Sequence, residues 1–185
     1  MPNDHSIPDD LDLIGSFVNT LHKDPVDPEV EELDSSSALS AWMKEHGIAP
    51  EGDLDAQDLE SAIRFREALR KLLRTNNGAP VDPESLAALR EAAREGLIRI
   101  EFDRTGRAVA APASRGLGAV FARLLAAVAD SQAAGTWERM KACADDDCEW
   151  AFFDSSKNRS RTWCSMEVCG NRAKTRAYRA RRRKA

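Results

Sequence analysis

Four cysteines near the C-terminal end carry the clearest chemistry in the sequence. Cys143, Cys148, Cys164 and Cys169 form two pairs with the same C-x4-C spacing, separated by fifteen residues. Two short-spaced pairs of thiolates can supply the four tetrahedral ligands of a structural zinc site. The three histidines all lie within the first 46 residues of the chain. The sequence therefore predicts a zinc ion held by the four cysteines.

Two disulfide bonds would use the same four cysteines and are the alternative. Disulfides require an oxidising compartment. Asp9, Asp10 and Asp12 interrupt the first apolar positions, so the chain lacks the basic and apolar regions of an export signal. We therefore expect a cytoplasmic protein, in which paired cysteines favour a metal site. The C-x-x-C pair typical of thioredoxin-like redox proteins is absent from the sequence.

A basic segment follows the last cysteine. From Gly170 onward the chain has eight basic residues and no acidic residue. At 100° per residue, four arginines of a helix over 171–184 lie within an arc of about 60°. We call these four the arginine ridge: Arg172, Arg176, Arg179 and Arg183.

Guanidinium groups pair well with phosphate oxygens, and the release of counterions drives such binding. The ridge therefore predicts a nucleic-acid contact, and a solvated basic helix end favoured by the helix dipole is the alternative. A basic hairpin turn could extend the contact surface. The predicted nucleic-acid-binding residues are Lys157, Arg159, Arg161, Asn171, Arg172, Lys174, Arg176, Arg179, Arg181, Arg182 and Arg183.

The segment from Cys143 to Arg183 resembles the CGNR zinc finger, a family named after the tetrapeptide found here at 169–172. The other matching stretches are Cys-Glu-Trp-Ala-Phe-Phe-Asp at 148–154, Asn-Arg-Ser-Arg at 158–161 and Trp-Cys-Ser-Met at 163–166. In that family the finger ends bacterial proteins regarded as stress-responsive transcription regulators. The resemblance implies zinc as the cofactor and DNA as the partner.

In the same family an N-terminal domain called ABATE precedes the finger. The stretch Phe-Val-Asn-Thr-Leu at 17–21 resembles the opening motif of that domain. Ser16 stands where the family usually has an acidic residue. The resemblance implies a sensory or regulatory domain in front of the finger.

The charge distribution divides the chain in the same place. From Thr136 to the end, thirteen Lys and Arg face seven Asp and Glu, a net charge of +6, which leaves −10 for the residues before it. Opposite charges indicate that one part is suited to a polyanion. The longest apolar stretch, 117–128, contains Arg123 and is too short to span a bilayer, so no membrane partner is expected.

Hydrophobic periodicity predicts a mainly helical protein with one small β-hairpin. We expect helices over about 11–21, 35–46, 55–74, from 82 onward and over 114–132, with a hairpin at 98–111 that packs on the helices. The predicted domains are a helical body over 1–134 and a zinc finger over 135–185. The linker is short, so the finger is expected to sit against the body.

The finger is expected to have a treble-clef-like arrangement that ends in the basic helix. It would place strands at 137–141, 150–153 and 159–163 around the two cysteine pairs. The acidic residues at 145–147 are interpreted as solvating the first turn, because four sulfurs already complete a zinc site. Ala173, Ala177 and Ala180 are expected to rest on the zinc hairpin.

Arg66 interrupts the apolar face of the helix at 55–74. It could bind an anion in a ligand pocket, or its aliphatic stem could pack while its head reaches solvent or a carboxylate, and the second interpretation is favoured. The body could bind a small-molecule effector near Arg66 or form a homodimer that brings two fingers to DNA.

The sequence contains no recognisable catalytic constellation, so an enzyme is not expected. The predicted function is a DNA-binding transcription regulator. A zinc-stabilised module that docks an acidic protein is an alternative. RNA binding is another, which Trp150 or Trp163 exposed on a platform would indicate.

Overall fold

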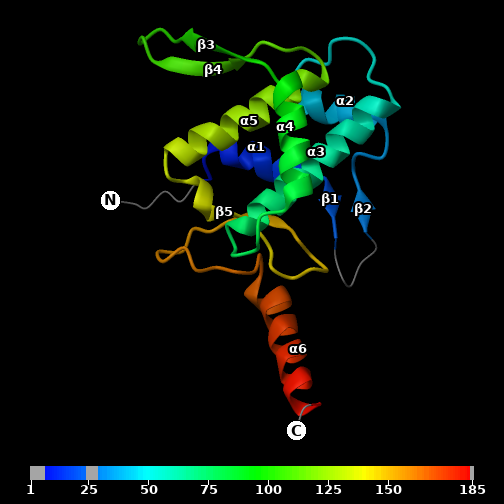
Figure 1. Ribbon diagram of the computed structural model, residues 1–185, viewed down its shortest axis with the longest axis vertical. Coiled ribbons are helices and arrows are strands. Elements are labelled where there is room, and N and C mark those ends of the chain that lie inside the picture. The colour runs from blue at the N-terminus through cyan, green and yellow to red at the C-terminus, as the bar shows by residue number, and fades with distance from the viewer. Residues whose placement is uncertain (1–6, 24–28, 184–185) are drawn as a thin grey trace.

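The computed structural model of the protein describes residues 7–23 and 29–183 (Figure 1). Its helices are α1 (Asp9–Val18), α2 (Ser36–Glu45), α3 (Ala56–Thr75), α4 (Pro83–Glu95), α5 (Leu117–Ala133) and α6 (Asn171–Arg182). Its strands are β1 (Leu21–His22), β2 (Val30–Glu31), β3 (Ile98–Phe102), β4 (Ala108–Pro112), β5 (Met140–Ala142) and β6 (Ala151–Phe153). The described strands form only three short, separate antiparallel pairs, and the helices make up most of the regular structure. The predicted mainly α class is therefore confirmed.

Side-chain caps explain why three helices begin where the sequence predicts. The Ser35 hydroxyl accepts a hydrogen bond from the Ala38 backbone N–H at 3.2 Å and starts α2. Asp55 forms a reciprocal capping box with Asp58 at the start of α3. Asp82 caps α4, whose first residue is a proline. Each cap satisfies backbone N–H groups that have no partner within the helix.

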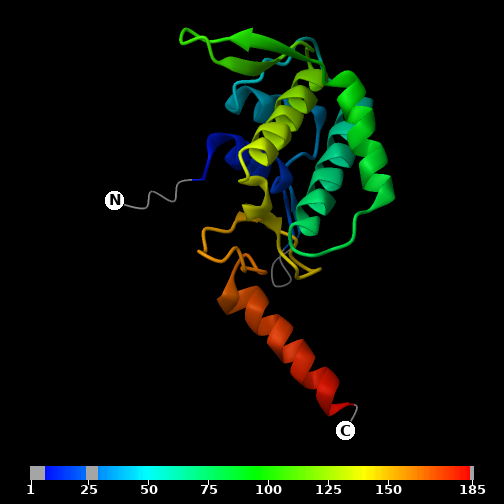
Figure 2. The same cartoon turned by 60° about the vertical axis from the view of Figure 1, so that its left-hand side comes forward.

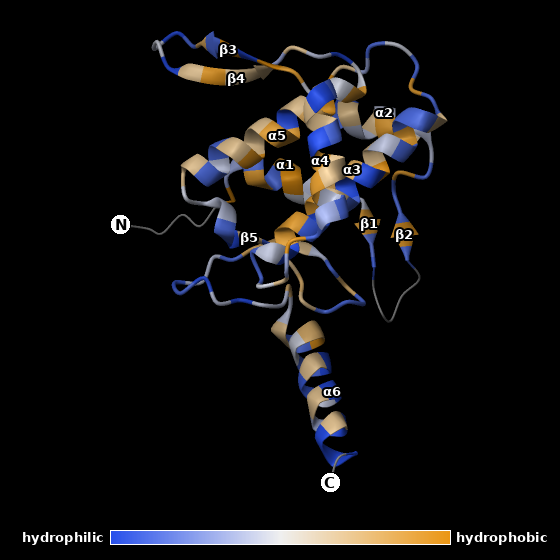
Figure 3. Cartoon of the chain, in the orientation of Figure 1, coloured by the Kyte–Doolittle hydropathy of each residue, from blue (hydrophilic) through white to orange (hydrophobic). Residues whose placement is uncertain are grey.

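The core of the body lies between α1, α3 and α5, which carry hydrophobic residues on their facing sides (Figure 3). Phe65 packs against Phe17 at 6.0 Å and against Phe121 at 4.8 Å between ring centroids. These contacts join one ring from each of the three helices. The helix expected over 114–132 is present as α5, and five of its apolar side chains are buried in this core: Leu117, Val120, Phe121, Leu124 and Val128.

The same core extends into the finger. Met140 and Ala142 of β5, Ala151 of β6 and Trp137 are buried in one cluster with the helices of the body. Gly15 of α1 lies so close that an added Cβ atom would be 2.9 Å from the Met140 methyl carbon. The finger therefore sits against the body, as the short linker predicts.

The hairpin β3–β4 packs only partly on the helices. Strand β4 lies next to α5, whereas Ile98, Ile100 and Phe102 of β3 are 43%, 64% and 73% exposed. The hairpin thus packs on the helices as predicted, mainly through β4, and β3 is the outer and more exposed strand. Figures 1 and 2 show the hairpin at the end of the molecule opposite α6.

Short elements account for further differences from the prediction. The pair β1–β2 was not predicted, because two residues per strand are too few to show alternation. The strand expected at 137–141 is a 3-10 turn, Trp137–Arg139, followed by β5. In the part of the chain that the structure describes, no helix is long and apolar enough to cross a membrane.

Ser16, at the position that is usually acidic in the resembled family, joins α1 to α2. Its hydroxyl lies 2.7 Å from Nε2 of His46 and accepts a hydrogen bond from Trp42 Nε1 at 3.3 Å. The His46 ring also stacks on Trp42 at 4.2 Å between centroids. These contacts give Ser16 and His46 a role in helix packing.

Candidate metal centre and basic helix

The four cysteines come together as the sequence predicts. Their sulfur atoms all lie within 4.8 Å of one another, and none of them is in a disulfide. Cys143 and Cys148 lie at the turn between β5 and β6. Cys164 precedes a π-helical turn, Met166–Gly170, and Cys169 lies within that turn, which leads into α6. This donor set and spacing match a tetrahedral structural zinc site.

The electrostatics of the cluster also fit a divalent cation. The hydrogen bond and the negative charge of the neighbouring Cys143 raise the pKa of Cys148 to about 12. The pKa of Cys164 is raised for the same reason, through contacts with Cys143 and Cys148. Several thiols so close together cannot ionise without a compensating positive charge, and a zinc ion would supply it.

Asp145 links the first cysteine turn to the basic helix. Its side chain is 0% exposed and accepts hydrogen bonds from Arg172 Nε at 3.0 Å and from Arg176 Nη2. Burial alone would raise the pKa of Asp145, but the Arg176 hydrogen bond and the two guanidinium charges outweigh it and lower that pKa. Arg176 also pairs with Asp147 at 2.9 Å.

The acidic residues at 145–147 therefore do not simply solvate the turn, and that interpretation was wrong. Asp145 and Asp147 pair with Arg172 and Arg176 of α6, and Asp146 pairs with Arg74 of the body at 2.7 Å. Sequence reasoning missed this role because the partners are brought close only by the metal cluster. The one signal in the sequence was the order of the charges. Acidic residues lie between the first two cysteines, and arginines follow the last cysteine.

The tetrapeptide at 169–172 closes the second cysteine turn. A Cβ atom at Gly170 would collide with the Met166 sulfur, so only glycine fits there without a shift. The Asn171 side-chain amide donates to the Glu167 carbonyl at 2.9 Å. Arg172 Nη2 donates to the Cys169 sulfur at 3.1 Å, while its Nη1 is buried without a partner among the described residues.

A buried ion pair organises the rest of the finger. Lys141 Nζ donates to Asp154 Oδ2 at 2.8 Å and to the Arg159 and Arg161 carbonyls at 2.6 and 3.0 Å. Asp154 in turn accepts from the Arg161 backbone N–H at 2.8 Å. The side chains of Lys141 and Asp154 thus make hydrogen bonds with backbone groups of Arg159 and Arg161 that a β-strand would direct to a neighbouring strand. The strand expected at 159–163 is therefore a loop, and that prediction was wrong.

Helix α6 extends away from the body beyond its first turn (Figures 1 and 2). None of its residues is buried. Ala177 and Ala180 are exposed and Ala173 is half-buried, so the expectation that the alanine face rests on the hairpin was wrong. The anchoring of the helix by Arg172 and Arg176 makes that packing unnecessary.

The structure divides the predicted nucleic-acid-binding residues into two groups. Arg172 and Arg176 are tied to the first cysteine turn, and Arg159 pairs with Glu138 at 2.9 Å. Arg161 donates to the Cys164 carbonyl and lies 5.0 Å from the Phe152 ring. Within residues 7–23 and 29–183, exposed basic residues with no ion pair include Lys157, Lys174, Arg179, Arg181, Arg182 and Arg183.

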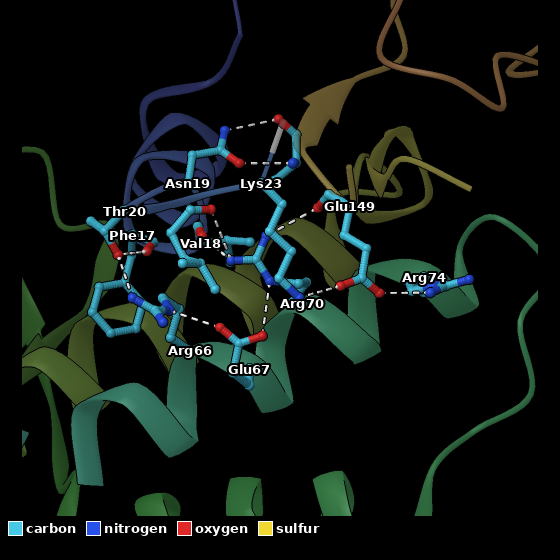
Figure 4. Close-up of polar contacts among 12 residues, drawn as sticks. Phe17, Val18, Asn19, Thr20, Lys23, Arg66, Glu67, Arg70, Arg74 and Glu149 are labelled. Atoms are coloured by element: carbon cyan, nitrogen blue, oxygen red, sulfur yellow. Dashed lines mark hydrogen bonds and ion pairs between the residues drawn. The ribbon is translucent and has the colours of Figure 1, made fainter. Parts of the chain in front are cut away.

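Arginines of α3 connect the body to the finger, as Figure 4 shows. Arg70 donates to the Glu149 carbonyl at 3.1 Å, and Arg74 Nη1 donates to the Glu149 carboxylate at 2.6 Å. Lys23 pairs with the same carboxylate at 2.9 Å. Glu149 directly follows the zinc-ligand candidate Cys148, so these bonds fix the first cysteine turn on the body.

Amide side chains complete this junction. Asn19 of α1 pairs reciprocally with the backbone of Ala151, at 3.0 and 2.8 Å. Asn76 donates to two carbonyls of the finger, and Asn77 donates to the carbonyls of Ala142 and Thr162 at 3.0 and 2.7 Å. The sequence analysis did not single out these amides as contacts between the body and the finger.

Arg66 has a different environment from the other predicted site residues. Its guanidinium is 1% exposed, pairs bidentately with Glu31 at 2.6 and 2.7 Å, and donates to Glu67 at 2.9 Å. Burial would raise the pKa of Glu31, but the Arg66 hydrogen bonds outweigh it and lower that pKa. The guanidinium of Arg66 thus pairs with carboxylates of the chain, and Glu67 links it to Arg70, which contacts the Glu149 carbonyl of the finger.

Replacing Arg66 by methionine is expected to lower the free energy of unfolding by about 3 kcal/mol, because it leaves Glu31 without its buried partner, whereas Glu67 keeps its pair with Arg70. Arg64→Met on the same helix breaks an exposed pair with Glu91 and serves as the control, with an expected loss below about 1 kcal/mol. Urea unfolding curves of both variants check this. Equal losses would contradict the structural role of Arg66.

Comparison with known families found two matching family models. The CGNR zinc finger matches residues 139–182. The ABATE family, described as "Putative stress-induced transcription regulator", matches residues 11–135, more than half of the chain. No curated protein matches the sequence. The chain therefore belongs to the ABATE family and carries a CGNR zinc finger behind its ABATE domain.

Proposed function

We propose that the protein is a DNA-binding transcription regulator whose finger holds one zinc ion through Cys143, Cys148, Cys164 and Cys169. The zinc ion would neutralise the thiolates and fix the second cysteine turn from which α6 begins. The finger would then present the exposed end of α6 to DNA. The ABATE domain would act as the regulatory part.

The observation that carries this proposal is the exposure of α6. From Gly170 onward the sequence has no acidic residue, and the described helix buries no side chain. Its outer basic residues have no ion-pair partner among the described residues, so their charge is available to phosphates. Phosphate contacts of this kind supply most of the affinity for DNA.

Two observations favour duplex DNA over a single strand. Trp150 and Trp163 are partly buried and pack against the cysteine cluster, and Trp150 makes an edge contact with His22 at 4.9 Å. They do not form an exposed stacking platform, on which single-stranded RNA recognition commonly depends. A straight basic helix that extends from the body is a shape that a DNA groove admits.

Removing the outer charges of α6 is expected to weaken duplex binding. In Arg179→Ala/Arg183→Ala, each lost phosphate contact lowers the slope of log affinity against log salt by about one unit, so the slope falls by about two. Fluorescence anisotropy with a labelled duplex at several salt concentrations measures this slope.

The matched control is Arg90→Ala/Arg94→Ala, which removes two exposed arginines from α4 of the body. It should leave both the affinity and the slope unchanged. An α6 variant with the wild-type slope would contradict the proposal. Binding of an acidic protein that persists in high salt, without DNA binding, would instead favour the protein-interaction alternative.

The ABATE domain is proposed to regulate the finger through their shared junction. The Glu149 carboxylate forms ion pairs with Lys23 and Arg74 of the body, and Glu149 directly follows Cys148 in the sequence. A small-molecule effector or a second copy that shifts the body would act on the finger through these bonds. Thermal unfolding with candidate ligands and the mass in solution separate the two mechanisms.

A further inference from the structure

The outer edge of strand β3 is open. On one side β3 pairs with β4 in an unbroken register over all five of its residues. On the other side it pairs with no strand among the described residues. Figures 1 and 2 show β3 on the side of the hairpin away from α5. An edge strand of this length without a proline or a bulge is a template on which another strand can pair.

The hydrogen bonds of the hairpin show which residues have their backbone groups at this edge. The Leu97 carbonyl accepts from the Ala113 N–H at 2.8 Å, and the Asp103 N–H donates to the Arg107 carbonyl at 3.0 Å. In an antiparallel pair, hydrogen-bonded residues alternate with residues whose N–H and C=O groups point away from the partner strand. The residues of β3 whose backbone groups point to the open edge are therefore Ile98, Ile100 and Phe102.

The other edge of the hairpin, on β4, is less suited to pairing. Pro112 lies opposite Ile98, at a position whose backbone groups also point away from the partner strand, and proline has no N–H to donate there. Strand β4 also lies next to α5. A further strand can therefore extend this sheet most readily at β3.

Side chains fix the hairpin at both ends. The Asp103 carboxylate accepts from the backbone N–H groups of Thr105 and Arg107, at 2.8 and 3.0 Å. The Ser114 hydroxyl accepts from the Leu97 N–H at 2.8 Å and donates to the Glu95 carbonyl. Because the edge is already ordered, pairing with another strand costs less conformational entropy.

The sequence of β3 is complementary to itself when two copies run antiparallel. With Ile100 of one copy opposite Ile100 of the second copy, Arg99 lies opposite Glu101. In the same register Ile98 lies opposite Phe102. Opposite charges and pairs of apolar side chains both stabilise positions that face each other across two strands.

The charges also distinguish this register from its neighbours. Arg99 and Glu101 become non-hydrogen-bonded pairs across the two copies, the kind of pair whose side chains lie closest. A shift by two residues would place Arg99 opposite Arg99, or Glu101 opposite Glu101, and like charges in such pairs are destabilising. A shift by one residue would bring charged side chains to the apolar face.

We propose that the protein forms a homodimer in which β3 pairs antiparallel with β3 of a second copy. The two hairpins form one four-stranded sheet, and a two-fold axis passes between the two copies of Ile100. The exposed side chains of Ile98, Ile100 and Phe102 from both copies form one apolar stripe on a single face of that sheet. This pairing depends neither on the zinc site nor on DNA binding.

The symmetry of the pair also sets where the two fingers lie. The two-fold axis is perpendicular to the sheet, so it reverses the direction that leads from the body to the open edge. The hairpin lies at the end of the molecule opposite α6 (Figures 1 and 2). The two basic helices therefore point away from each other, which suits two separate segments of DNA better than two adjacent half-sites.

Sedimentation of the full-length chain tests the pairing. Small interfaces are weak, so the runs cover concentrations from about 1 µM to about 1 mM. We expect the average mass to rise from that of one chain towards that of two chains. A wild-type chain that sediments as a monomer over the whole range overturns the proposal.

Ile100→Lys places two like charges beside the two-fold axis and is expected to raise the dissociation constant by at least about tenfold. Val81→Lys is the matched control, because Val81 is 57% exposed, close to the 64% of Ile100, and lies outside the hairpin. It should leave the dissociation constant unchanged. Circular dichroism shows whether both variants keep the helical signal. A folded Ile100→Lys variant that dimerises like the wild type overturns the assignment to β3.

Two charge variants test the register itself. Arg99→Glu and Glu101→Arg each oppose like charges across the two-fold axis, so each variant alone is expected to dimerise at least about tenfold more weakly than the wild type. In an equimolar mixture the two variants present opposite charges to each other at both positions and should form a heterodimer. A fluorescent label on one variant follows this association by sedimentation.

Recovery in the mixture cannot come from a change in the folding of either chain, because each chain is the same as in its own run. A mixture that associates no better than the separate variants overturns the proposed register. A chain that dimerises through β3 but binds no DNA supports this inference and contradicts the proposed function alone.

Discussion

Replacing Cys143 by serine is expected to abolish zinc binding and unfold the finger. Cys143 is fully buried, and its thiolate is one of four donors in the proposed site. Binding of structural zinc supplies on the order of 10 kcal/mol to small zinc domains, so a finger of about fifty residues cannot keep its fold without it. Metal analysis by mass spectrometry and circular dichroism of the variant measure both effects.

Loss of the zinc is also expected to lower the thermal midpoint of the body. Met140 and Ala142 of β5 and Ala151 of β6 belong to the core of the helices, so an unfolded finger exposes part of that core. Cys164→His keeps a zinc-ligating group at the most exposed of the four positions and serves as the control, with metal retained. A wild-type chain with two disulfides and no metal would contradict the prediction.

Replacing Asp154 by asparagine is expected to lower the free energy of unfolding of the finger by about 3–5 kcal/mol. Asp154 and Lys141 are 0% and 5% exposed, and removing one charge leaves the other buried without its partner. Asp147→Asn, which breaks an exposed pair with Arg176, is the matched control and should leave stability unchanged within error. Thermal unfolding of the zinc-loaded variants compares the two.

The same pair predicts how stability depends on pH. Burial would raise the pKa of Asp154, but hydrogen bonds from Lys141, Ser156 and Arg161 outweigh it and lower the pKa to about 2, below the ordinary value of 3.8. Its contribution is therefore fully present above about pH 4 and is lost as the pH falls towards 2. Asp154→Asn should lack this component of acid unfolding, and an identical acid profile would argue against the pair.

Local signals in the sequence predicted most of the regular structure and the metal cluster. Ser35, Asp55 and Asp82 mark helix starts because an N-cap acts within three residues of itself. The equal spacing of the cysteine pairs predicted their convergence, because the geometry of a zinc site constrains that spacing. Periodicity also identified the face of α5 that is buried.

Pairs of charged residues that are distant in sequence could not be predicted. Arg66 and Glu31 are separated by 35 positions, and Arg172 and Asp145 by 27. The spacing of charged residues in the sequence does not show which residues pair with each other. Each of these residues was therefore interpreted by itself, as a solvated surface residue or as an exception on an apolar face. The arginine ridge shows the consequence: its spacing was right, but Arg172 and Arg176 are held by acids of the first cysteine turn.

Selection from a random pool of duplex DNA tests the central claim most directly. The zinc-loaded, full-length chain is incubated with the pool near physiological salt, and bound duplexes are sequenced over successive rounds. If the finger reads DNA as a regulator does, the rounds should converge on a common motif, and chelation of the zinc should abolish enrichment. A pool that shows no bound fraction, or no enrichment of any motif over the starting library, would contradict the proposed function.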